Sequence, residues 1–170
     1  MILIAAADKN HAIGKDNKLL YDIPDDMAFF RQKTLGKVVV MGRETLLSFK
    51  NAQPLKDRKN IVLSRDKNLK IDGAAVCHDL PSLFREIAGY PIDGVFVIGG
   101  ESVYLQLAPF CSAAYITEID AIAAAPDKYL KGVYENPHFY LHSASETKEY
   151  NGIKYRFCEY INSAVVDFCE

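Results

Sequence analysis

The sequence contains no tryptophan, although ten tyrosines and nine phenylalanines supply aromatic side chains. Its four cysteines form no C-x-x-C pair and its four histidines show no metal-ligand spacing, so the pattern predicts no metal site. Positive and negative charges nearly balance at a formal net charge of -2, and nothing in their distribution favours a nucleic-acid partner. No apolar run is long enough to cross a membrane.

The apolar start of the chain, residues 1–7, is cut off by the polar residues 8–10 and has no basic segment before it. It is therefore too short for a signal peptide, and we expect a cytoplasmic protein in which cysteines stay reduced. At 170 residues, 49% of them hydrophobic, the chain is expected to form a single domain over residues 1–170. No long apolar surface stripe is evident, so we expect a monomer. The expected free thiols are Cys77, Cys111, Cys158 and Cys169.

Short apolar runs alternate with helical patterns over the first 119 residues. The runs predict strands at Ile2–Ala7, Lys37–Met41, Asn60–Leu63, Ala74–Cys77, Gly94–Ile98 and Ala113–Ile119. The helical patterns predict helices at about Asp25–Thr34, Arg43–Phe49, Leu80–Ala88 and Ser102–Leu107. This alternation is typical of an α/β fold with a mainly parallel sheet and helices on both faces.

Two further segments are not part of that alternation. Tyrosine-rich strands are predicted at roughly Phe139–Ser143 and Ile153–Ile161, with a polar turn containing Asn151-Gly152 between them. They predict an antiparallel hairpin at one edge of the sheet. Near the N-terminus, Lys9–Tyr21 shows no periodicity, and loops of that length are often functional.

Two neighbouring carboxylates stand in the first turn of the predicted helix at Asp25–Thr34, where acidic residues suit the helix dipole. The apolar face of this helix lies about 150° from Asp25 but only about 50° from Asp26. We therefore expect Asp25 to face water and Asp26 to point toward the core, where a carboxylate needs hydrogen-bond donors. The pattern leaves two interpretations of Asp26 equally open, a ligand-binding carboxylate and a structural one. The residues that define the apolar face are Ile23, Met27, Phe29 and Phe30.

Three of the predicted strands end in groups that suit a phosphate, and ligands of open α/β sheets bind at such carboxyl ends. The three ends are Gly42-Arg43-Glu44-Thr45, Ser64-Arg65 and Gly99-Gly100. Taken singly, each signal is weak: Gly99-Gly100 is also consistent with a simple turn, and for Arg43 or Arg65 alone a solvated surface charge is the favoured interpretation. Together they predict a phosphorylated dinucleotide along the sheet edge, although no G-x-G-x-x-G fingerprint is present.

Six blocks of the sequence, in order along the chain, together form a specific pattern. They are Leu3–Ala6 with Ile13-Gly14; Ile23-Pro24-x-Asp26 with Phe30 and Thr34; Val40–Thr45; Arg58–Ser64; Val97–Gly100 with Val103-Tyr104; and Tyr115–Asp120. Through these blocks the chain resembles the bacterial-type dihydrofolate reductases over nearly its whole length. The resemblance implies an eight-stranded mixed sheet flanked by four helices, with an adenosine-binding subdomain at about residues 37–90. It also implies reduction of 7,8-dihydrofolate to 5,6,7,8-tetrahydrofolate by NADPH, in support of one-carbon metabolism.

The resemblance implies roles for individual residues. Asp26 would accept N–H bonds from the pterin ring and act in catalysis together with Tyr21, and Arg58 would form a bidentate pair with the glutamate α-carboxylate. Lys9–Tyr21 would be a mobile lid over the nicotinamide, and antifolates are expected to bind. The other expected substrate contacts are Ile4, Ala6, Met27, Phe30, Arg31, Leu55, Ile98 and Thr117. The expected NADPH contacts are Ala6, Ile13, Gly14, Asn17, Leu19, Gly42, Arg43, Glu44, Thr45, Leu63, Ser64, Arg65, Ile98, Gly99, Gly100, Glu101, Ser102, Val103 and Tyr104.

Some positions depart from the family pattern. Leu20-Tyr21 stands where Pro-Trp is usual, and Glu101-Ser102 follows the glycine pair where a small and a basic residue are frequent. The loop Ala121–Asp127 lacks the usual acidic character, and Ser163–Glu170 runs past the expected last strand.

Two other functions stay open. One is a related NADPH-dependent pterin or pyrimidine reductase of the same fold, which would not need both Asp26 and Arg58. The other is a catalytically silent nucleotide-binding module, in which Asp26 only caps a helix. The presence of both residues favours the folate interpretation.

Overall fold

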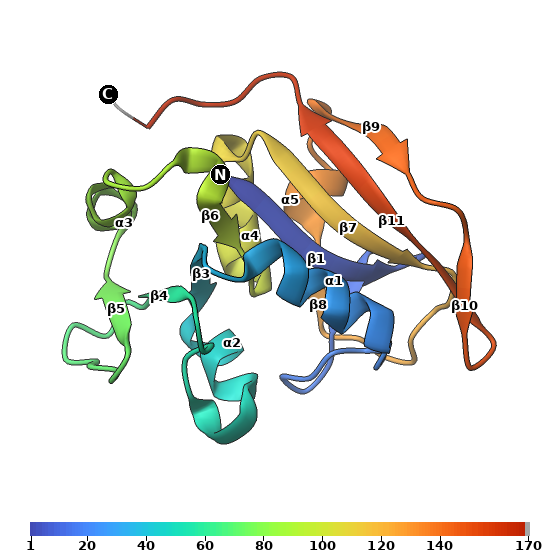
Figure 1. The fold of residues 1–170 in the computed structure, drawn as a ribbon, viewed down its shortest axis with the longest axis horizontal. Coiled ribbons are helices and arrows are strands. Elements are labelled where there is room, and N and C mark those ends of the chain that lie inside the picture. The colour runs from blue at the N-terminus through green and yellow to red at the C-terminus, as the bar shows by residue number, and fades with distance from the viewer. Residues whose placement is uncertain (169–170) are drawn as a thin grey trace.

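A twisted sheet runs through the centre of the molecule, with helices packed against both of its faces (Figure 1). The computed structural model describes residues 1–168. Along the sheet the strand order is β10-β11-β7-β1-β6-β3-β4-β5, and β9 also pairs with β11. The strands are β1 (Ile2–Asp8), β3 (Val38–Gly42), β4 (Lys59–Leu63), β5 (Ala74–Cys77), β6 (Val95–Val97), β7 (Ala113–Ile119), β9 (Phe139–Ala144), β10 (Lys148–Tyr150) and β11 (Ile153–Asn162).

The expected mainly parallel sheet is confirmed. The strand pairs β1 with β6, β1 with β7, β3 with β4, β3 with β6 and β4 with β5 are all parallel. These strands carry continuous apolar runs such as Val38–Met41, which is fully buried because helices cover both faces. The helices are α1 (Pro24–Thr34), α2 (Arg43–Ser48), α3 (Leu80–Ile87), α4 (Glu101–Leu107) and α5 (Lys131–Tyr134), and short 3₁₀ turns occur at Lys50–Ala52, Ile92–Gly94 and Ala108–Phe110.

The sheet separates two hydrophobic clusters. On one face, α3, α4 and α5 contribute buried side chains such as Leu83, Leu107 and Val133. On the other face, Leu46 from α2 is buried, and α1 packs its aromatic residues Phe29 and Phe30 against the same cluster. Among residues 1–168 no helix is both long and apolar enough to span a membrane.

The C-terminal hairpin is confirmed, with one change in its layout. β11 lies between β7 and the outer strands and is antiparallel to all of its partners. The expected outer strand is divided into two strands, β9 and β10, which both pair with β11. The sheet therefore has nine strands where eight were expected. Asn151 and Gly152 both have positive φ, which is what a tight hairpin turn between β10 and β11 requires.

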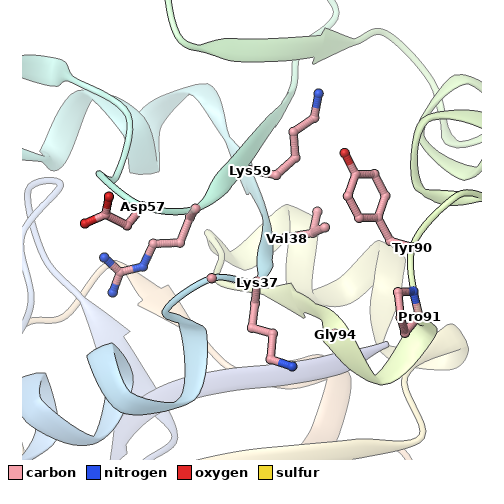
Figure 2. A pocket seen from close by; sticks show the side chains of 9 residues that line it. Lys37, Val38, Asp57, Lys59, Tyr90, Pro91 and Gly94 are labelled. Atoms are coloured by element: carbon pink, nitrogen blue, oxygen red, sulfur yellow. The ribbon is translucent and has the colours of Figure 1, made fainter.

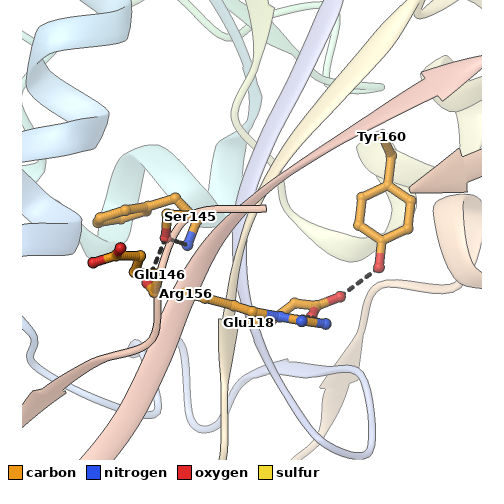
Figure 3. Close-up of polar contacts among 6 residues, drawn as sticks. Glu118, Ser145, Glu146, Arg156 and Tyr160 are labelled. Atoms are coloured by element: carbon orange, nitrogen blue, oxygen red, sulfur yellow. Dashed lines mark hydrogen bonds and ion pairs between the residues drawn. The ribbon is translucent and has the colours of Figure 1, made fainter. Parts of the chain in front are cut away.

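Polar contacts fix the break between β9 and β10 (Figure 3). Ser145 accepts a hydrogen bond from the Phe157 N–H through its hydroxyl oxygen (3.0 Å) and donates to the Glu146 carbonyl (2.8 Å). On the neighbouring strand pair, Arg156 donates to Glu118 from Nε (3.0 Å) and Nη2 (2.8 Å), and the Tyr160 hydroxyl also donates to Glu118. These bonds connect β7, β11 and the outer segment.

The expected irregular loop Lys9–Tyr21 contains a strand, which the sequence analysis missed. This strand, β2 (Ala12–Gly14), pairs with β8 (Lys128–Tyr129) in a separate two-stranded sheet. The short helix α5 after β8 was also missed, so there are five helices rather than four in the described residues. Elements of two to four residues are too short to show a hydrophobic periodicity, so their conformation depends on contacts with the rest of the fold. Gly132 illustrates this, because a Cβ there would lie only 3.0 Å from the Tyr104 carbonyl oxygen of α4.

The segment beyond the last strand packs against α3. The Phe168 ring stacks on Phe84 with a centroid distance of 4.6 Å, and the Val166 N–H donates to the Pro109 carbonyl (2.9 Å). The expected thiols Cys77, Cys111 and Cys158 are free and buried. Cys169 and Glu170 lie outside the described residues.

Candidate active site

The first turn of α1 directs two adjacent carboxylates in opposite directions, as the helix pattern predicted. Asp26 points to the sheet, where its Oδ1 accepts a hydrogen bond from the Thr117 hydroxyl on β7 at 2.5 Å. Asp25 has a half-exposed side chain and accepts bonds from Lys148 Nζ (3.1 Å) and the Tyr155 hydroxyl (3.0 Å) on the outer strands. The carboxylate that faces the sheet is therefore the candidate for chemistry.

The surroundings of Asp26 favour its neutral form. Burial raises the pKa of the Asp26 carboxyl above its ordinary value, and the bond from Thr117 opposes this shift only in part. An ionised carboxylate offers about four acceptor positions, and Thr117 occupies one of them. Asp26 can therefore accept further bonds from a ligand that carries N–H groups.

Apolar residues expected to bind the substrate gather on the α1 side of the sheet. Ile4, Phe30, Leu55 and Ile98 belong to one hydrophobic cluster, and Ala6 lies in an adjoining cluster with Tyr21. Met27 does not pack into the core as the apolar face of α1 predicted, because its side chain is 45% exposed. Phe29 of the same face does pack inward, and its ring stacks on Phe157 at a centroid distance of 4.4 Å. Arg31 is exposed on the outer side of the same helix.

The guanidinium of Arg58 is held at the C-terminal end of α1. Its Nη1 donates to the Lys56 carbonyl (2.7 Å), and its Nη2 and Nε lie 3.2 and 3.4 Å from the Thr34 hydroxyl oxygen. Burial lowers the pKa of Arg58, and the nearby charge of Arg31 lowers it further. Two cations at this point make a carboxylate ligand favourable.

Asn60 was not predicted as a functional residue, yet it shapes the segment that carries Arg58. Its side chain is buried; Nδ2 donates to the Leu55 carbonyl (2.8 Å) and the Arg58 carbonyl (3.1 Å), and Oδ1 accepts the Leu55 N–H (2.9 Å). The loop from Leu55 to Arg58 is thereby closed on itself. The sequence did offer one sign of this role, because Asn60 is a polar residue inside a predicted buried strand and must find hydrogen-bond partners there.

A cavity of about 580 Å³ opens beside Arg58, at the amino ends of β3 and β4 (Figure 2). The side chains of Lys59 and Tyr90 lie on one side of it and Asp57 on the other. Lys59 forms an ion pair with Glu86 at 2.9 Å. This cavity is at the opposite end of the strands from the glycine-rich ends, and it shares only Arg58 with the expected substrate residues. It is therefore not the pterin pocket.

The expected phosphate-binding strand ends do come together. The N–H of Gly42, the last residue of β3, donates to the carbonyl of Gly99 after β6 at 2.7 Å, and a Cβ on Gly100 would lie 3.4 Å from the Thr45 hydroxyl. Gly99 has a φ of +107°, and a Cβ there would lie 2.9 Å from the Tyr104 ring. The ring is fixed because its hydroxyl donates to the Ile4 carbonyl at 2.8 Å. Missing side chains thus leave a cradle of backbone groups at the starts of α2 and α4.

Arg43 and Arg65 lie on the same edge, because they follow the paired neighbours Gly42 and Leu63 of β3 and β4. Both are exposed, and neither guanidinium forms a hydrogen bond or ion pair with another group in residues 1–168. Cations without protein partners beside a backbone cradle suit a phosphorylated dinucleotide. Among the other expected NADPH contacts, Leu63 and Ser64 are half-buried, Glu44 and Ser102 are exposed, and Val103 is buried.

Glu101 has a structural contact that the sequence analysis did not foresee. Its Oε1 accepts the Tyr129 N–H of β8 at 3.3 Å. β8 pairs with β2, so Glu101 connects α4 to the expected lid. Within that lid Ile13 is half-buried and Gly14 is buried, while Asn17 and Leu19 are exposed.

Tyr21 stands at the end of the lid, next to the first turn of α1. Its hydroxyl is buried and has no hydrogen-bond partner among residues 1–168. Burial raises the pKa of Tyr21, and the negative charge of Asp8 raises it further. Both residues line a small cavity of about 10 Å³ together with parts of the lid.

Comparison with known proteins supports the resemblance. A family model described as dihydrofolate reductase matches residues 1–162. The chain belongs to the dihydrofolate reductase family. The dihydrofolate reductase of Neisseria meningitidis serogroup B is 33% identical over 160 residues, which cover 94% of this chain and 96% of that protein. Those of Bacillus subtilis and Staphylococcus haemolyticus are 38% and 35% identical over 116 and 117 residues, which cover 68% and 69% of this chain and 67% and 68% of those proteins.

The fold is similar to a solved member of the family. The structure of dihydrofolate reductase from Enterococcus faecalis, complexed with NADP(H) and RAB-propyl, has a TM-score of 0.84 and 26% sequence identity. The match covers 95% of each chain. The departures from the pattern expected of the family are Leu20-Tyr21, Glu101-Ser102, the loop Ala121–Asp127 and the segment Ser163–Glu170.

Proposed function

We propose a division of roles among the site residues of this chain, which is an NADPH-dependent oxidoreductase that reduces 7,8-dihydrofolate to 5,6,7,8-tetrahydrofolate. The observation that carries the proposal is the Asp26 carboxylate, which faces the sheet, is bonded by Thr117 and has acceptor positions to spare. It lies beside the apolar cluster that includes Ile4 and Phe30.

Asp26 and Arg58 would hold the two ends of the substrate. Asp26 would accept N–H bonds from the pterin, while Ile4, Phe30 and Ile98 contact the apolar faces of the ring system. Arg58 would pair with the glutamate α-carboxylate, and its present bonds to Lys56 and Thr34 fix the plane of the guanidinium before binding.

The edge formed by the strand ends would hold NADPH, which supplies the hydride when bound. The cradle at Gly99 and Gly100 suits the pyrophosphate, because without side chains at these positions the backbone N–H groups at the start of α4 can approach it. Gly42 would shape the cradle through its bond to the Gly99 carbonyl. Arg43 and Arg65 suit the 2'-phosphate, since both are exposed cations on neighbouring strand ends. The lid would cover this edge and exclude water.

Reduction also requires a proton at N5 of the substrate. Asp26 is the titratable group we assign to this step, and it would act by holding and polarising the pterin while water delivers the proton. A carboxyl whose pKa is raised by burial suits a group that must influence proton transfer near neutral pH. Tyr21 would order a water with its buried hydroxyl.

Some broader features are also proposals. We place the protein in the cytoplasm as a monomer, with one domain and an adenosine-binding subdomain at about residues 37–90. Antifolate binding is proposed because compounds that carry N–H groups can use the same free acceptor positions of Asp26.

The test is the loss of NADPH absorbance at neutral pH with and without dihydrofolate. We expect oxidation that depends on dihydrofolate and is lost on adding an antifolate. Oxidation with a pyrimidine substrate alone would support the related reductase instead. Cofactor binding without any turnover would support the silent module.

A further inference from the structure

Asp8, at the end of β1, is a buried carboxylate outside the proposed substrate and cofactor contacts. It is only 4% exposed. Its Oδ1 accepts the N–H groups of Asn10 (2.9 Å) and Ala12 (2.9 Å), and its Oδ2 accepts the Ala123 N–H (2.9 Å). One side chain therefore satisfies three backbone donors. Burying a carboxylate costs free energy unless the group is well hydrogen-bonded, so these three bonds are expected to serve a purpose.

The three donors belong to the two segments that build the lid. Asn10 and Ala12 lie at its start, and Ala12 is the first residue of β2. Ala123 lies in the connection between β7 and β8, and β8 pairs with β2 further along. Farther from Asp8, the Asp127 N–H donates to the Gly14 carbonyl at 3.1 Å. Asp8 thus fixes both segments at the point where they leave the sheet.

The far end of the lid returns to the same carboxylate. Tyr21 and Asp8 line one cavity of about 10 Å³, together with Ala12 and Ile13 of β2. A volume of about this size holds a single water. The Tyr21 hydroxyl is buried without a partner among residues 1–168, and Oδ2 of Asp8 has acceptor capacity beyond its one bond. A shared water would satisfy both groups.

We propose that Asp8 is a positioning residue that holds both ends of the lid. It holds the start through the N–H groups of Asn10 and Ala12 and the end through a water shared with Tyr21, and it binds the supporting connection between β7 and β8 through the Ala123 N–H. The proposal rests on the assignment of residues 9–21 as the lid. Its consequence is that Ile13 and Gly14 are held against the cofactor edge. Asp8 therefore acts on cofactor binding without touching the cofactor.

Two variants and one control test this. Asp8→Ala removes all three acceptor bonds, whereas Asp8→Asn keeps the shape and one acceptor oxygen, and carries the test if the alanine variant does not fold. The matched control is Asp120→Asn. Asp120 is also a carboxylate bound to the lid segment, but it is half-exposed and pairs with Lys9 Nζ on the surface (2.6 Å).

The first readout compares the change in the KM for NADPH with the change in the KM for dihydrofolate. We expect the KM for NADPH to rise about tenfold in Asp8→Ala and less in Asp8→Asn, as the loss of charge-assisted hydrogen bonds predicts. The KM for dihydrofolate should change by less than about twofold, since Asp26 and Arg58 keep their contacts. Asp120→Asn should leave both constants within about twofold. An unchanged KM for NADPH in both Asp8 variants, or an equal rise in the control, would overturn the proposal.

The second readout does not depend on turnover. Hydrogen exchange at the Asn10, Ala12 and Ala123 amides should be slow in the unmodified protein and in Asp120→Asn, and fast in Asp8→Ala. Slow exchange in Asp8→Ala would overturn the anchoring role even if the enzyme were active. Absence of dihydrofolate-dependent turnover in the unmodified protein would instead count against the proposed function alone.

The water link to Tyr21 is tested by a double-variant cycle. If Asp8 and Tyr21 share a water, the effects of Asp8→Asn and Tyr21→Phe on the KM for NADPH should not multiply, and the double variant should resemble Asp8→Asn. Independent, multiplying effects would refute the link.

Discussion

Replacing Asp26 by Asn keeps the shape of the side chain and removes its charge. The Asn carbonyl oxygen can still accept the Thr117 hydroxyl bond, so the variant should fold. The amide has lost one acceptor oxygen, and a pterin N–H that needs a charged acceptor is then poorly paired. The loss of charged hydrogen bonding together with help in proton delivery should cost on the order of 3 to 4 kcal/mol. This corresponds to roughly two to three decades in kcat/KM.

The pH dependence of stability and of the reaction rate gives a second test of Asp26. Burial raises the pKa of this carboxyl in the folded protein, so the folded state holds the proton over a pH range in which the unfolded state has lost it. Stability of the parent must then fall as pH rises through that range. Asp26→Asn lacks this titration, so its unfolding temperature should improve relative to the parent as pH rises from the ordinary carboxyl pKa. Acid should also partly restore its rate, because substrate protonated in solution no longer needs the site.

The assay is kcat/KM for dihydrofolate across pH 5 to 9 for the parent and the variant, with the fold checked by circular dichroism. Asp25→Asn is the matched control, because Asp25 lies in the same turn but bonds Lys148 and Tyr155 on the surface. It should keep its rate within about twofold. If Asp26→Asn has nearly the activity of the parent at neutral pH, Asp26 has only a structural role and no part in the reaction.

Three further substitutions test the other assignments. Arg65→Ala should raise the KM for NADPH about tenfold or more and leave that for NADH unchanged, since one charge-assisted phosphate bond is lost; equal constants for the two cofactors in the parent would contradict this. Tyr21→Phe should lower kcat by no more than about fivefold, because a water-mediated bond contributes about 1 kcal/mol; abolished turnover would mean that the hydroxyl transfers a proton directly. Arg58→Lys should raise the KM for dihydrofolate about tenfold and leave kcat largely unchanged. The reason is that an ammonium group cannot pair bidentately with a carboxylate or keep the contact with the Thr34 hydroxyl. An unchanged KM would show that Arg58 does not bind the substrate.

The parts of the fold that the sequence predicted are those in which a local pattern and the tertiary packing agree. Strands such as β3 are buried on both faces and therefore carry continuous apolar runs that can be recognised without a structure. The helical period placed Asp25 and Asp26 on opposite sides of α1, and their partners lie on those sides. The same period was wrong for Met27, whose side chain is 45% exposed although Phe29 and Phe30 of the same face pack against the core.

Other features depend on contacts between residues far apart in the chain. Asp8 and Ala123 are 115 positions apart, and neither shows locally that it will meet the other. Likewise β2, β8 and α5 could not be predicted, since two to four residues carry no period of their own. Glu101 was expected among the NADPH contacts, and its bond with the Tyr129 N–H could not be predicted because β8 was not.

The position of Tyr21 makes the lid accessible to optical measurement. The chain has no indole group, so its emission comes from tyrosine and carries no background from tryptophan. Tyr21→Trp would place one fluorophore at the end of the lid, beside α1 and within the cluster that includes Ala6 and Ile23. Each opening or closing of the lid would then change the solvent around a single ring, and rapid mixing with NADPH would report the motion in real time.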